Sequence, residues 1–261
     1  MLRRRLIAAA ALALPWPLHA QRRRAREEPL RLGADSALAA CGFVQALAAA
    51  FGRESGLPIR PVAAPTSAML EALEQGEIDA GLGLAPDAEA RLEQKGLVHD
   101  RRAIARTGFV LVGPATRGLL PDGATGSADA ARALAVLAAA GVPFLGRNDG
   151  SGAHWLEQML WRTAAVAPDP PWWRELAAGA DALEAARQQQ ACVIVDRPAW
   201  QAGRRHGLTA LVSEDARLTV PVHLMRSFRA DHPVARLFAR WVSGPRGRRF
   251  VAARTAFSPP G

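Results

Sequence analysis

The fold is decided by the stretch Pro143-Phe-Leu-Gly-Arg-Asn-Asp-Gly-Ser-Gly-Ala-His154 and the segment Trp155-Leu-Glu-Gln-Met-Leu-Trp161 that follows it. The apolar run at residues 142–145 predicts a short buried strand, which ends in a turn rich in Gly, Asn, Asp and Ser. After the turn, residues recur at the i, i+3, i+4 and i+7 spacing of one helix face, namely Leu156, Met159, Leu160 and Thr163. The stretch therefore predicts a strand, a turn and a helix in direct succession.

The start of this helix has the features of an anion receptor. Asp149 or Ser151 can cap it, and the unpaired N–H groups of its first turn point outward. The helix dipole favours negative charge at that end, and Arg147 just upstream adds a planar pair of donors that suits oxyanions. The rest of the chain is expected to form the opposite side of a binding site that has this helix start on one side.

Composition indicates a globular protein of one large domain or two lobes. The chain has 261 residues, 49% of them apolar and 22% charged. Its net charge of +9 comes almost wholly from arginine, because Lys95 is the only lysine. The arginines are dispersed, which favours scattered solvated charges over a field that attracts anions. Without an aromatic and basic platform, no nucleic-acid partner is expected.

The N-terminus predicts export to the periplasm. A short basic segment, Met-Leu-Arg-Arg-Arg, precedes an apolar stretch at residues 6–18 that is too short to span a bilayer comfortably. Ala20 offers a small residue at the cleavage point, so residues 1–20 are predicted to be a signal peptide and residues 21–28 a flexible leader. The arginines fit general secretion or a twin-arginine signal, and both routes stay open.

Two cysteines, Cys41 and Cys192, are far apart in sequence. We expect small buried residues, with a disulfide as the alternative. Neither the cysteines nor the scattered histidines have the spacing of metal ligands. No metal and no cofactor are therefore expected.

Predicted strands and helices alternate along the chain, which is typical of an α/β fold with a mostly parallel sheet. Strands are predicted at residues 30–33, 59–64, 80–84, 109–114, 142–145, 191–196, 208–212 and 218–225. Ligands of such sheets bind where the carboxyl ends of strands lead into helices. The loops at that edge are Ala34-Asp35-Ser36, Pro65-Thr66-Ser67, residues 146–151 and Asp196-Arg197. They predict a pocket for a small polar anion, although Ser and Thr are also common helix caps, as Thr66 or Ser67 would be.

Several segments resemble the bacterial extracellular solute-binding proteins. These include residues 51–62, Arg101-Arg102 and residues 109–114. The motif Gly146-Arg-Asn-Asp-Gly-Ser-Gly-Ala-His154 is similar to Ser-Arg-Gly-Asp-Asp-Ser-Gly-Thr-His of the tungstate-binding proteins of ABC importers. Asp196-Arg197 resembles that family's Thr-Asp-Arg, and residues 238–247 resemble its C-terminal helix pair.

The resemblance implies two α/β lobes of the periplasmic-binding-protein fold, each a mostly parallel sheet flanked by helices and joined by crossing hinge strands. The first lobe would comprise residues 29–113 and 221–261, and the second residues 114–220. The oxyanion would lie between them, feeding the membrane permease of an ABC importer, with the protein a monomer. The implied ligand residues are Arg147, Ser151, Gly152, Ser36, Thr66, Asp149, Asp196 and Arg197.

The chain departs from the family's pattern at the ligand loops. Ala34-Asp35-Ser36-Ala37 replaces a Thr-Thr-Thr-Ser loop, which leaves one hydroxyl and adds a negative charge. Ala153 replaces the Thr of the arginine motif. Each lost donor would cost roughly 1–3 kcal/mol if an oxyanion oxygen stayed unpaired, so the identity of the ligand stays open.

Two other functions are compatible with the sequence. A ligand sensor for a membrane signalling partner would use the same fold and cleft. A hydrolase built on Ser151 and His154 is less well supported, because the sequence lacks the Gly-x-Ser-x-Gly elbow of such enzymes. We therefore expect a binding protein and no enzyme.

Overall fold

The structure, a computed structural model, describes residues 28–115, 120, 129–177, 179–203 and 207–260. The expected signal peptide at 1–20 and the expected leader, apart from Glu28, lie outside the described residues.

Helices and strands alternate along the described chain, in agreement with the predicted fold class. In chain order they are β1 (Leu30–Asp35), α2 (Ser36–Ala40), α3 (Phe43–Ser55), β2 (Ile59–Ala64), α4 (Thr66–Gln75), β3 (Ala80–Gly83), α5 (Pro86–Gln94), β4 (Val98–Pro114), α6 (Ala130–Ala139), β5 (Phe144–Gly146), α7 (Gly152–Thr163), β6 (Trp173–Glu175), α8 (Ala182–Gln189), β7 (Val193–Asp196), α9 (Arg197–Ala202), β8 (Leu208–Val212), a 3-10 turn (Ala216–Leu218), β9 (Thr219–Ser227), α10 (Pro233–Ser243), α11 (Pro245–Ala252) and β10 (Phe257–Ser258).

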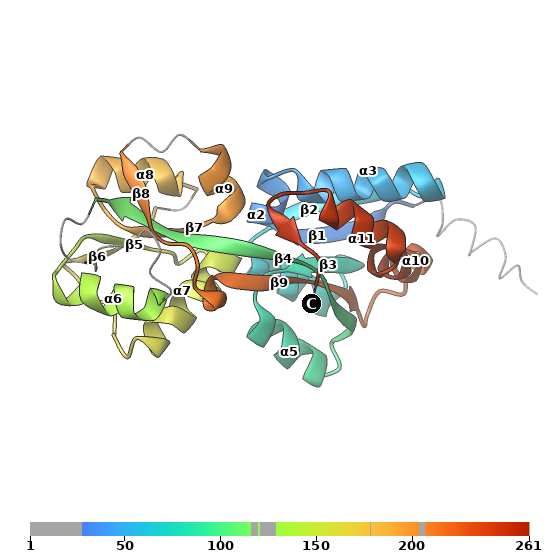
Figure 1. The fold of residues 1–261 in the computed structure, drawn as a ribbon. Helices are drawn as coiled ribbons and strands as arrows, with labels where there is room; N and C mark the ends of the chain where they lie inside the picture. Colours follow the sequence, from blue (N-terminus) through green and yellow to red (C-terminus); the bar gives the residue numbers. More distant parts are fainter. Residues whose placement is uncertain (1–27, 116–119, 121–128, 178, 204–206, 261) are drawn as a thin grey trace, which may run out of the picture.

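The elements form two lobes that lie side by side (Figure 1). One lobe contains β1 to β3 with α2 to α5, and the C-terminal helices α10 and α11 return to it. The other lobe contains β5 to β8 with α6 to α9. Strands β4 and β9 run between the lobes, as expected of the crossing strands.

Parallel pairing occurs within each lobe, and antiparallel pairing joins the lobes. In the first lobe β1 lies between β2 and β3 and is parallel to both, and in the second lobe β5 is parallel to β6. The 17-residue strand β4 is antiparallel to β9 over its first part and to β7 and β8 over its second part. Because β4 pairs in both lobes, one continuous strand joins them.

The second part of β4 is buried on both faces. Phe109 and Leu111 belong to the largest apolar cluster, whereas Val110 and Val112 belong to a second cluster in the second lobe. Successive side chains of a strand point to opposite faces, so a continuous apolar run supplies two cores at once.

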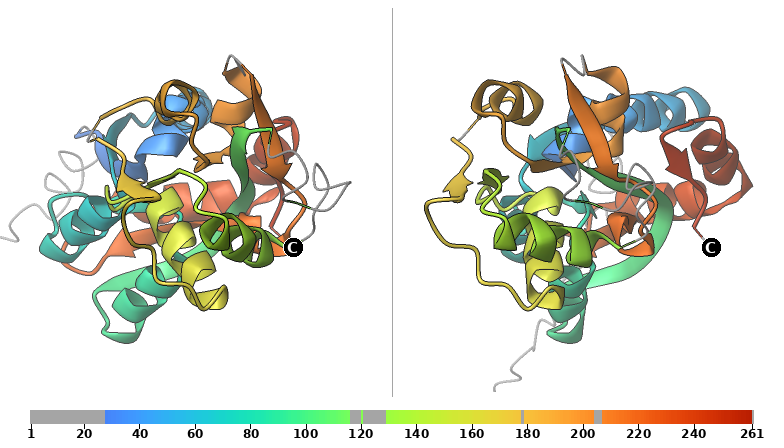
Figure 2. Two further views of the ribbon diagram at one scale, coloured as in Figure 1. Left: turned by 90° about the vertical axis from the view of Figure 1, so that its left-hand side faces the viewer. Right: turned by 60° about the vertical axis from the view of Figure 1, so that its left-hand side comes forward.

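The C-terminal helices pack on α3. His232 caps α10 through a hydrogen bond from Val234 N to its Nδ1 (3.2 Å), with Pro233 at the first helical position. The buried face of α10 places Phe238 edge-on to Phe51 of α3, with ring centroids 5.4 Å apart. Figure 2 shows these helices, in red, beside the blue helix α3.

The predicted strands at residues 59–64 and 208–212 are confirmed without change, whereas the other predicted strands differ at one or both ends. The strand predicted at 109–114 begins eleven residues earlier, at Val98, because the charged residues of its first part pair with β9 at the sheet surface. The strand predicted at 142–145 is Phe144–Gly146. Neither Thr66 nor Ser67 caps α4, because Thr66 is already its first residue and Pro65 precedes it without a side-chain bond.

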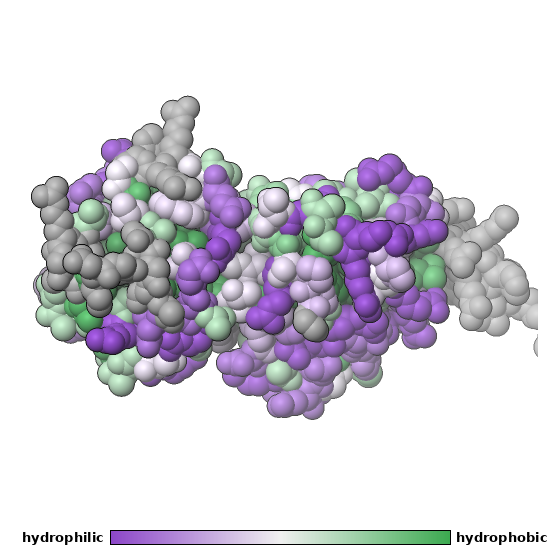
Figure 3. Space-filling view, viewed as in Figure 1, coloured by the Kyte–Doolittle hydropathy of each residue, from purple (hydrophilic) through white to green (hydrophobic). Residues whose placement is uncertain are grey.

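The surface carries dispersed polar side chains. Hydrophilic residues cover much of the first lobe, around α5 and near α3 and α11 (Figure 3). Val62 and Phe228 are the large apolar side chains that stay exposed in the described part of the chain. Among the described helices, none combines the length and the apolar character that a bilayer crossing requires.

The lobes contact each other where the turn before α7 meets α4. Ser67 N donates to Gly150 O (2.9 Å), and Trp155 Nε1 donates to Ser67 Oγ (3.2 Å). Gly152 packs so closely on the first lobe that a Cβ at this position would lie 2.5 Å from Leu84 Cβ. The first residue of α7 therefore has to be glycine for the lobes to approach this far.

The expectation of two buried cysteines is wrong for Cys41, which is exposed at the end of the short helix α2, and right for Cys192. Both thiols are free. Burial raises the pKa of Cys192 to about 12, which suppresses its reactive thiolate.

A thiol titration follows from this difference. A disulfide-exchange reagent at pH 8 should label Cys41 in the folded protein and both cysteines after unfolding in guanidinium. Two labelled thiols in the folded protein, or none in the unfolded one, would contradict the structure.

Substitution of Gly152 tests the close approach of the lobes. Gly152→Ala should lower the free energy of unfolding by about 1–3 kcal/mol, because the added methyl group must displace Leu84 or separate the lobes. Gly52→Ala in α3 is the matched control: its Cβ would lie 3.7 Å from Leu57 O, and alanine in a helix should stabilise by about 0.5–1 kcal/mol. Urea denaturation measures both. Equal effects of the two substitutions would contradict the inter-lobe contact.

Candidate functional site

A cleft of about 470 Å³ lies between the two lobes. The first lobe contributes the turn from β1 to α2 and Pro65, and the second lobe contributes the turn before α7 and the starts of α8 and α9. The polar side chains that line it are Asp35, Ser36, Arg147, Asp149, Ser151, Asp181 and Asp196. The cleft thus lies where strands lead into helices, as α/β sheets place their ligands.

The turn before α7 is organised around Arg147. Its guanidinium donates from Nε (3.0 Å) and Nη2 (2.6 Å) to Asp149 Oδ2, and Nη2 lies 3.4 Å from Ser151 Oγ. Asp149 also accepts from Ser151 N (3.0 Å) through its other oxygen. Burial raises the pKa of Asp149, but the hydrogen bonds with Ser151 and the charge of Arg147 outweigh it and hold that pKa below its usual range. The charge of Arg147 is therefore already partnered within the turn.

Ser151 caps α7, so the sequence alternative between Asp149 and Ser151 is resolved. Ser151 Oγ accepts from His154 N at 3.3 Å. The next N–H, that of Gly152, points across the cleft to the first lobe, where it donates to Asp35 Oδ2 at 2.9 Å.

Asp35 accepts the hydrogen bonds that gather at the first lobe's side of the site. Its side chain is fully buried, and its Oδ2 accepts from Thr66 Oγ1 (2.6 Å) as well as from Gly152 N, while its Oδ1 accepts from Ala37 N (2.9 Å). Burial raises the pKa of Asp35, and these three hydrogen bonds oppose the rise. The carboxylate links the starts of α2, α4 and α7.

Asp196 and Arg197 lie in different places although they are neighbours in sequence. Asp196 lines the cleft and caps α9 by accepting from Ala199 N at 2.8 Å, and burial raises its pKa. The Arg197 guanidinium instead donates to Ser213 O at 2.6 Å and packs against Gly108, where the chain crosses between the lobes.

Of the eight residues expected at the site, five line the cleft: Ser36, Arg147, Asp149, Ser151 and Asp196. Thr66 and Gly152 lie directly behind it and reach it through Asp35. Arg197 lies away from it. Two lining residues are not among the eight expected: Asp35, whose charge is evident in the sequence, and Asp181, which caps α8.

Glu157 supports the turn before α7 through hydrogen bonds. It is almost fully buried, and it accepts from Arg147 N (2.9 Å) and from Trp161 Nε1 (3.1 Å). Its position on α7, ten residues after Arg147, gave no local signal in the sequence. Burial raises the pKa of Glu157 to about 7.

The charge balance of the cleft is acidic. Four carboxylates line it, those of Asp35, Asp149, Asp181 and Asp196, against the single guanidinium of Arg147 among its described lining residues. Three of these carboxylates cap helices, α2, α8 and α9, whose N-termini face the cleft. No group of three or more His, Cys, Asp or Glu side chains in the described part of the chain is arranged to hold a metal ion.

Ser151 and His154 do not face each other as a nucleophile and its base. The His154 ring accepts from Gly150 N at Nδ1 (3.0 Å) and contacts Gln158 Nε2 at Nε2 (2.5 Å). Burial lowers the pKa of His154. Both ring nitrogens are thus engaged elsewhere than at the Ser151 hydroxyl.

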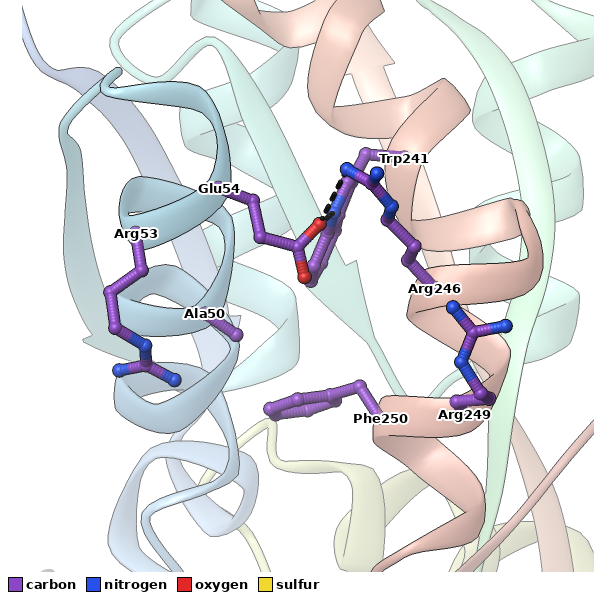
Figure 4. A pocket seen from close by; sticks show the side chains of 7 residues that line it. All are labelled: Ala50, Arg53, Glu54, Trp241, Arg246, Arg249 and Phe250. Atoms are coloured by element: carbon purple, nitrogen blue, oxygen red, sulfur yellow. Dashed lines mark hydrogen bonds and ion pairs between the residues drawn. The ribbon is translucent and has the colours of Figure 1, made fainter.

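Two other pockets each belong to one lobe. One of about 560 Å³ lies between α3 and the C-terminal helices, where Glu54 reaches Trp241 Nε1 (2.9 Å) and Arg246 Nη1 (3.0 Å), with Arg53 and Arg249 at its edges (Figure 4). Another of about 680 Å³ lies on the outer side of α7. Neither combines described residues from both lobes, so the cleft is the better candidate for ligand binding.

Comparison with known proteins gives consistent matches. A family model described as the PBP superfamily domain matches residues 25–222. A protein of Haloferax volcanii named as an ABC transporter anion-binding protein is 29% identical over 229 residues, which are 82% of this chain and 66% of that protein. A tungstate-binding protein of Peptoclostridium acidaminophilum is 26% identical over 222 residues, which are 80% of this chain and 76% of that protein.

A similar structure is also known. The structure titled as the tungstate ABC transporter from Geobacter sulfurreducens superposes with a TM-score of 0.74 at 26% identity, covering 87% of this chain and 99% of that one. The chain spans just under two thirds of the Haloferax protein's length.

Substitution of Glu157 gives a pH-dependent prediction. The folded protein keeps a proton on this carboxyl up to about pH 7, whereas the unfolded chain releases it near the ordinary value of 4.5. The stability from this group is therefore complete below pH 4.5 and is lost as the pH rises through 7. Between pH 4.5 and 7.5, the free energy of unfolding should fall by about 2–3 kcal/mol more in the wild type than in Glu157→Gln.

Urea denaturation at several pH values measures this difference. Glu71→Gln, at an exposed position of α4, is the control and should leave the pH dependence unchanged. A Glu157→Gln protein with the wild-type pH dependence would show that Glu157 ionises normally in the folded state.

Proposed function

Because the chain belongs to the PBP superfamily, we propose that it is the solute-binding protein of an ABC importer and captures a small anion between its lobes. The names of the relatives, an anion-binding and a tungstate-binding protein, support this function. A tungstate- or molybdate-like oxyanion is the proposed ligand class.

The observation that carries the proposal is the pairing of two walls across the cleft. One wall has the guanidinium of Arg147 and the start of α7, and the opposite wall has Ser36 beside Asp35. A guanidinium and a helix N-terminus together favour an anion. A cleft between two lobes joined by shared strands also lets a solute stabilise one relative position of the lobes.

The roles follow from these positions. Arg147 is the charged group, with Asp149 orienting it, and Ser151 acts at the start of α7. Ser36 and Asp196 line the cleft from the two lobes, and Thr66 and Gly152 act through Asp35, to which both donate. Arg197 supports the crossing between the lobes, since its guanidinium binds Ser213 O.

The proposal includes the cellular setting. Residues 1–20 direct export to the periplasm, and the exported monomer delivers its solute to a membrane permease. The lobes comprise residues 29–113 with 221–261, and residues 114–220. The protein acts as a carrier and catalyses no reaction, in line with the contacts of both His154 ring nitrogens, which are to Gly150 N and Gln158 Nε2.

A solute screen tests the proposal. Thermal unfolding of the chain from residue 21 is followed with tungstate, molybdate, sulfate, phosphate and small carboxylates up to millimolar concentration. A ligand at 100 times its dissociation constant should stabilise the protein by roughly 2.7 kcal/mol. Arg147→Ala should weaken binding of the active anion at least about tenfold, because a charge-assisted hydrogen bond contributes roughly 1.5–3 kcal/mol.

Arg236→Ala is the matched control, since Arg236 is exposed on α10 and pairs with Asp231 far from the cleft. It should leave the affinity unchanged. If no anion stabilises the wild type, or if Arg147→Ala binds as tightly as the wild type, the proposed function fails.

A further inference from the structure

The Asp35 carboxylate lies in the position where a bound anion would be expected. It is fully buried beside the cleft, and each of its hydrogen bonds comes from a group that could otherwise hold an oxyanion. Thr66 Oγ1 donates at 2.6 Å and Gly152 N at 2.9 Å, both to the same oxygen. These donors come from the starts of α4 and α7, which are ten and twelve residues long.

Two of the three predicted ligand residues that do not line the cleft, Thr66 and Gly152, donate to Asp35. Thr66 and Gly152 are turned to Asp35 and reach the cleft only through it. Arg147 is likewise engaged with a carboxylate of this chain, that of Asp149. The two carboxylates differ in burial, because the Asp149 side chain is 38% exposed whereas Asp35 is fully buried.

The bond from Gly152 to Asp35 also joins the lobes. It lies next to the Ser67–Gly150 and Trp155–Ser67 hydrogen bonds, which are neutral, and it is the one among these three that involves a charged side chain. A buried carboxylate at this point strengthens the contact between α7 and the first lobe. The same charge repels a second anion that approaches the same donors.

Resting on the proposed function, we infer that Asp35 is the specificity-determining residue of the cleft, an internal carboxylate that occupies the oxyanion position between Thr66 and Gly152. A fully ionised tetrahedral oxyanion reaches these donors only by displacing it. The wild type therefore binds such dianions more weakly than the same cleft without this charge. Asp35 thereby lowers the affinity of the cleft for dianions such as tungstate without excluding them.

Removal of the carboxylate tests the inference. Asp35→Ser removes the negative charge and leaves space where the carboxylate lay, and the serine hydroxyl can still cap α2. Isothermal titration of the chain from residue 21 with tungstate, molybdate and sulfate should give at least about tenfold tighter binding to Asp35→Ser than to the wild type, since like charges in close contact cost several kcal/mol.

A second variant keeps the test valid if Asp35→Ser folds poorly. Asp35→Asn preserves the size of the side chain and its cap on α2 while it removes the charge, so it should bind more tightly than the wild type but less tightly than Asp35→Ser. Asp79→Asn is the matched control, because Asp79 is a buried aspartate of the same lobe that pairs with Arg31 outside the cleft. It should not change the affinity.

The outcomes separate the inference from the proposed function. Equal or weaker oxyanion binding by both Asp35 variants overturns the inference, even where Arg147→Ala abolishes binding and the function stands. Tighter binding by the Asp35 variants and by Asp79→Asn alike also overturns it, because a general loosening of the lobe would then be the cause. If neither the wild type nor the variants bind any anion, the wild-type titration itself rejects the proposed function, and the inference falls with it.

Discussion

Strand β4 is the constraint on which the two-lobed structure depends. Its first part pairs with β9 in the first lobe, and its second part pairs with β7 and β8 in the second lobe. Its apolar run contributes to two cores through opposite faces. Because one strand belongs to both lobes, the ends of β1 and β5 face each other across a cleft. A relative motion of the lobes has to bend β4 and β9, which run between them.

The cleft has the hydrogen-bond donors of an anion receptor, and carboxylates of the chain already accept from these donors. Arg147 pairs with Asp149, and the donors Thr66 and Gly152 bind Asp35. The starts of α8 and α9 are capped by aspartates in the same way. The relatives are named for anion binding, but in this cleft the chain's own carboxylates already pair with Arg147 and with the N-termini of the helices. The energetic question for any anion is which of these internal partners it replaces.

Local patterns predicted the turn at Arg147 well, because every signal in it acts over a few residues. The apolar run before it, the cap at Ser151 and the helix period after it all lie within about one turn of the residues that they organise. The strand at residues 59–64 was predicted for the same reason. The signals failed where partners are distant. The charged first part of β4 has no apolar pattern that predicts a strand, and it forms one by pairing with β9. No local feature of the sequence distinguishes the exposed Cys41 from the buried Cys192.

The sequence by itself determined the α/β alternation, the strand-to-helix loops that carry the polar side chains, and the guanidinium at the start of α7. These depend on periodicity, capping and turn chemistry, which are local. Only the tertiary structure decided how those loops meet. It buried Asp35 between Thr66 and Gly152, placed Glu157 under Arg147, and turned Arg197 away from its neighbour Asp196. Each of these arrangements joins residues far apart in the chain or fixes the direction of one side chain. Such choices follow from packing and from the pairing of buried polar groups.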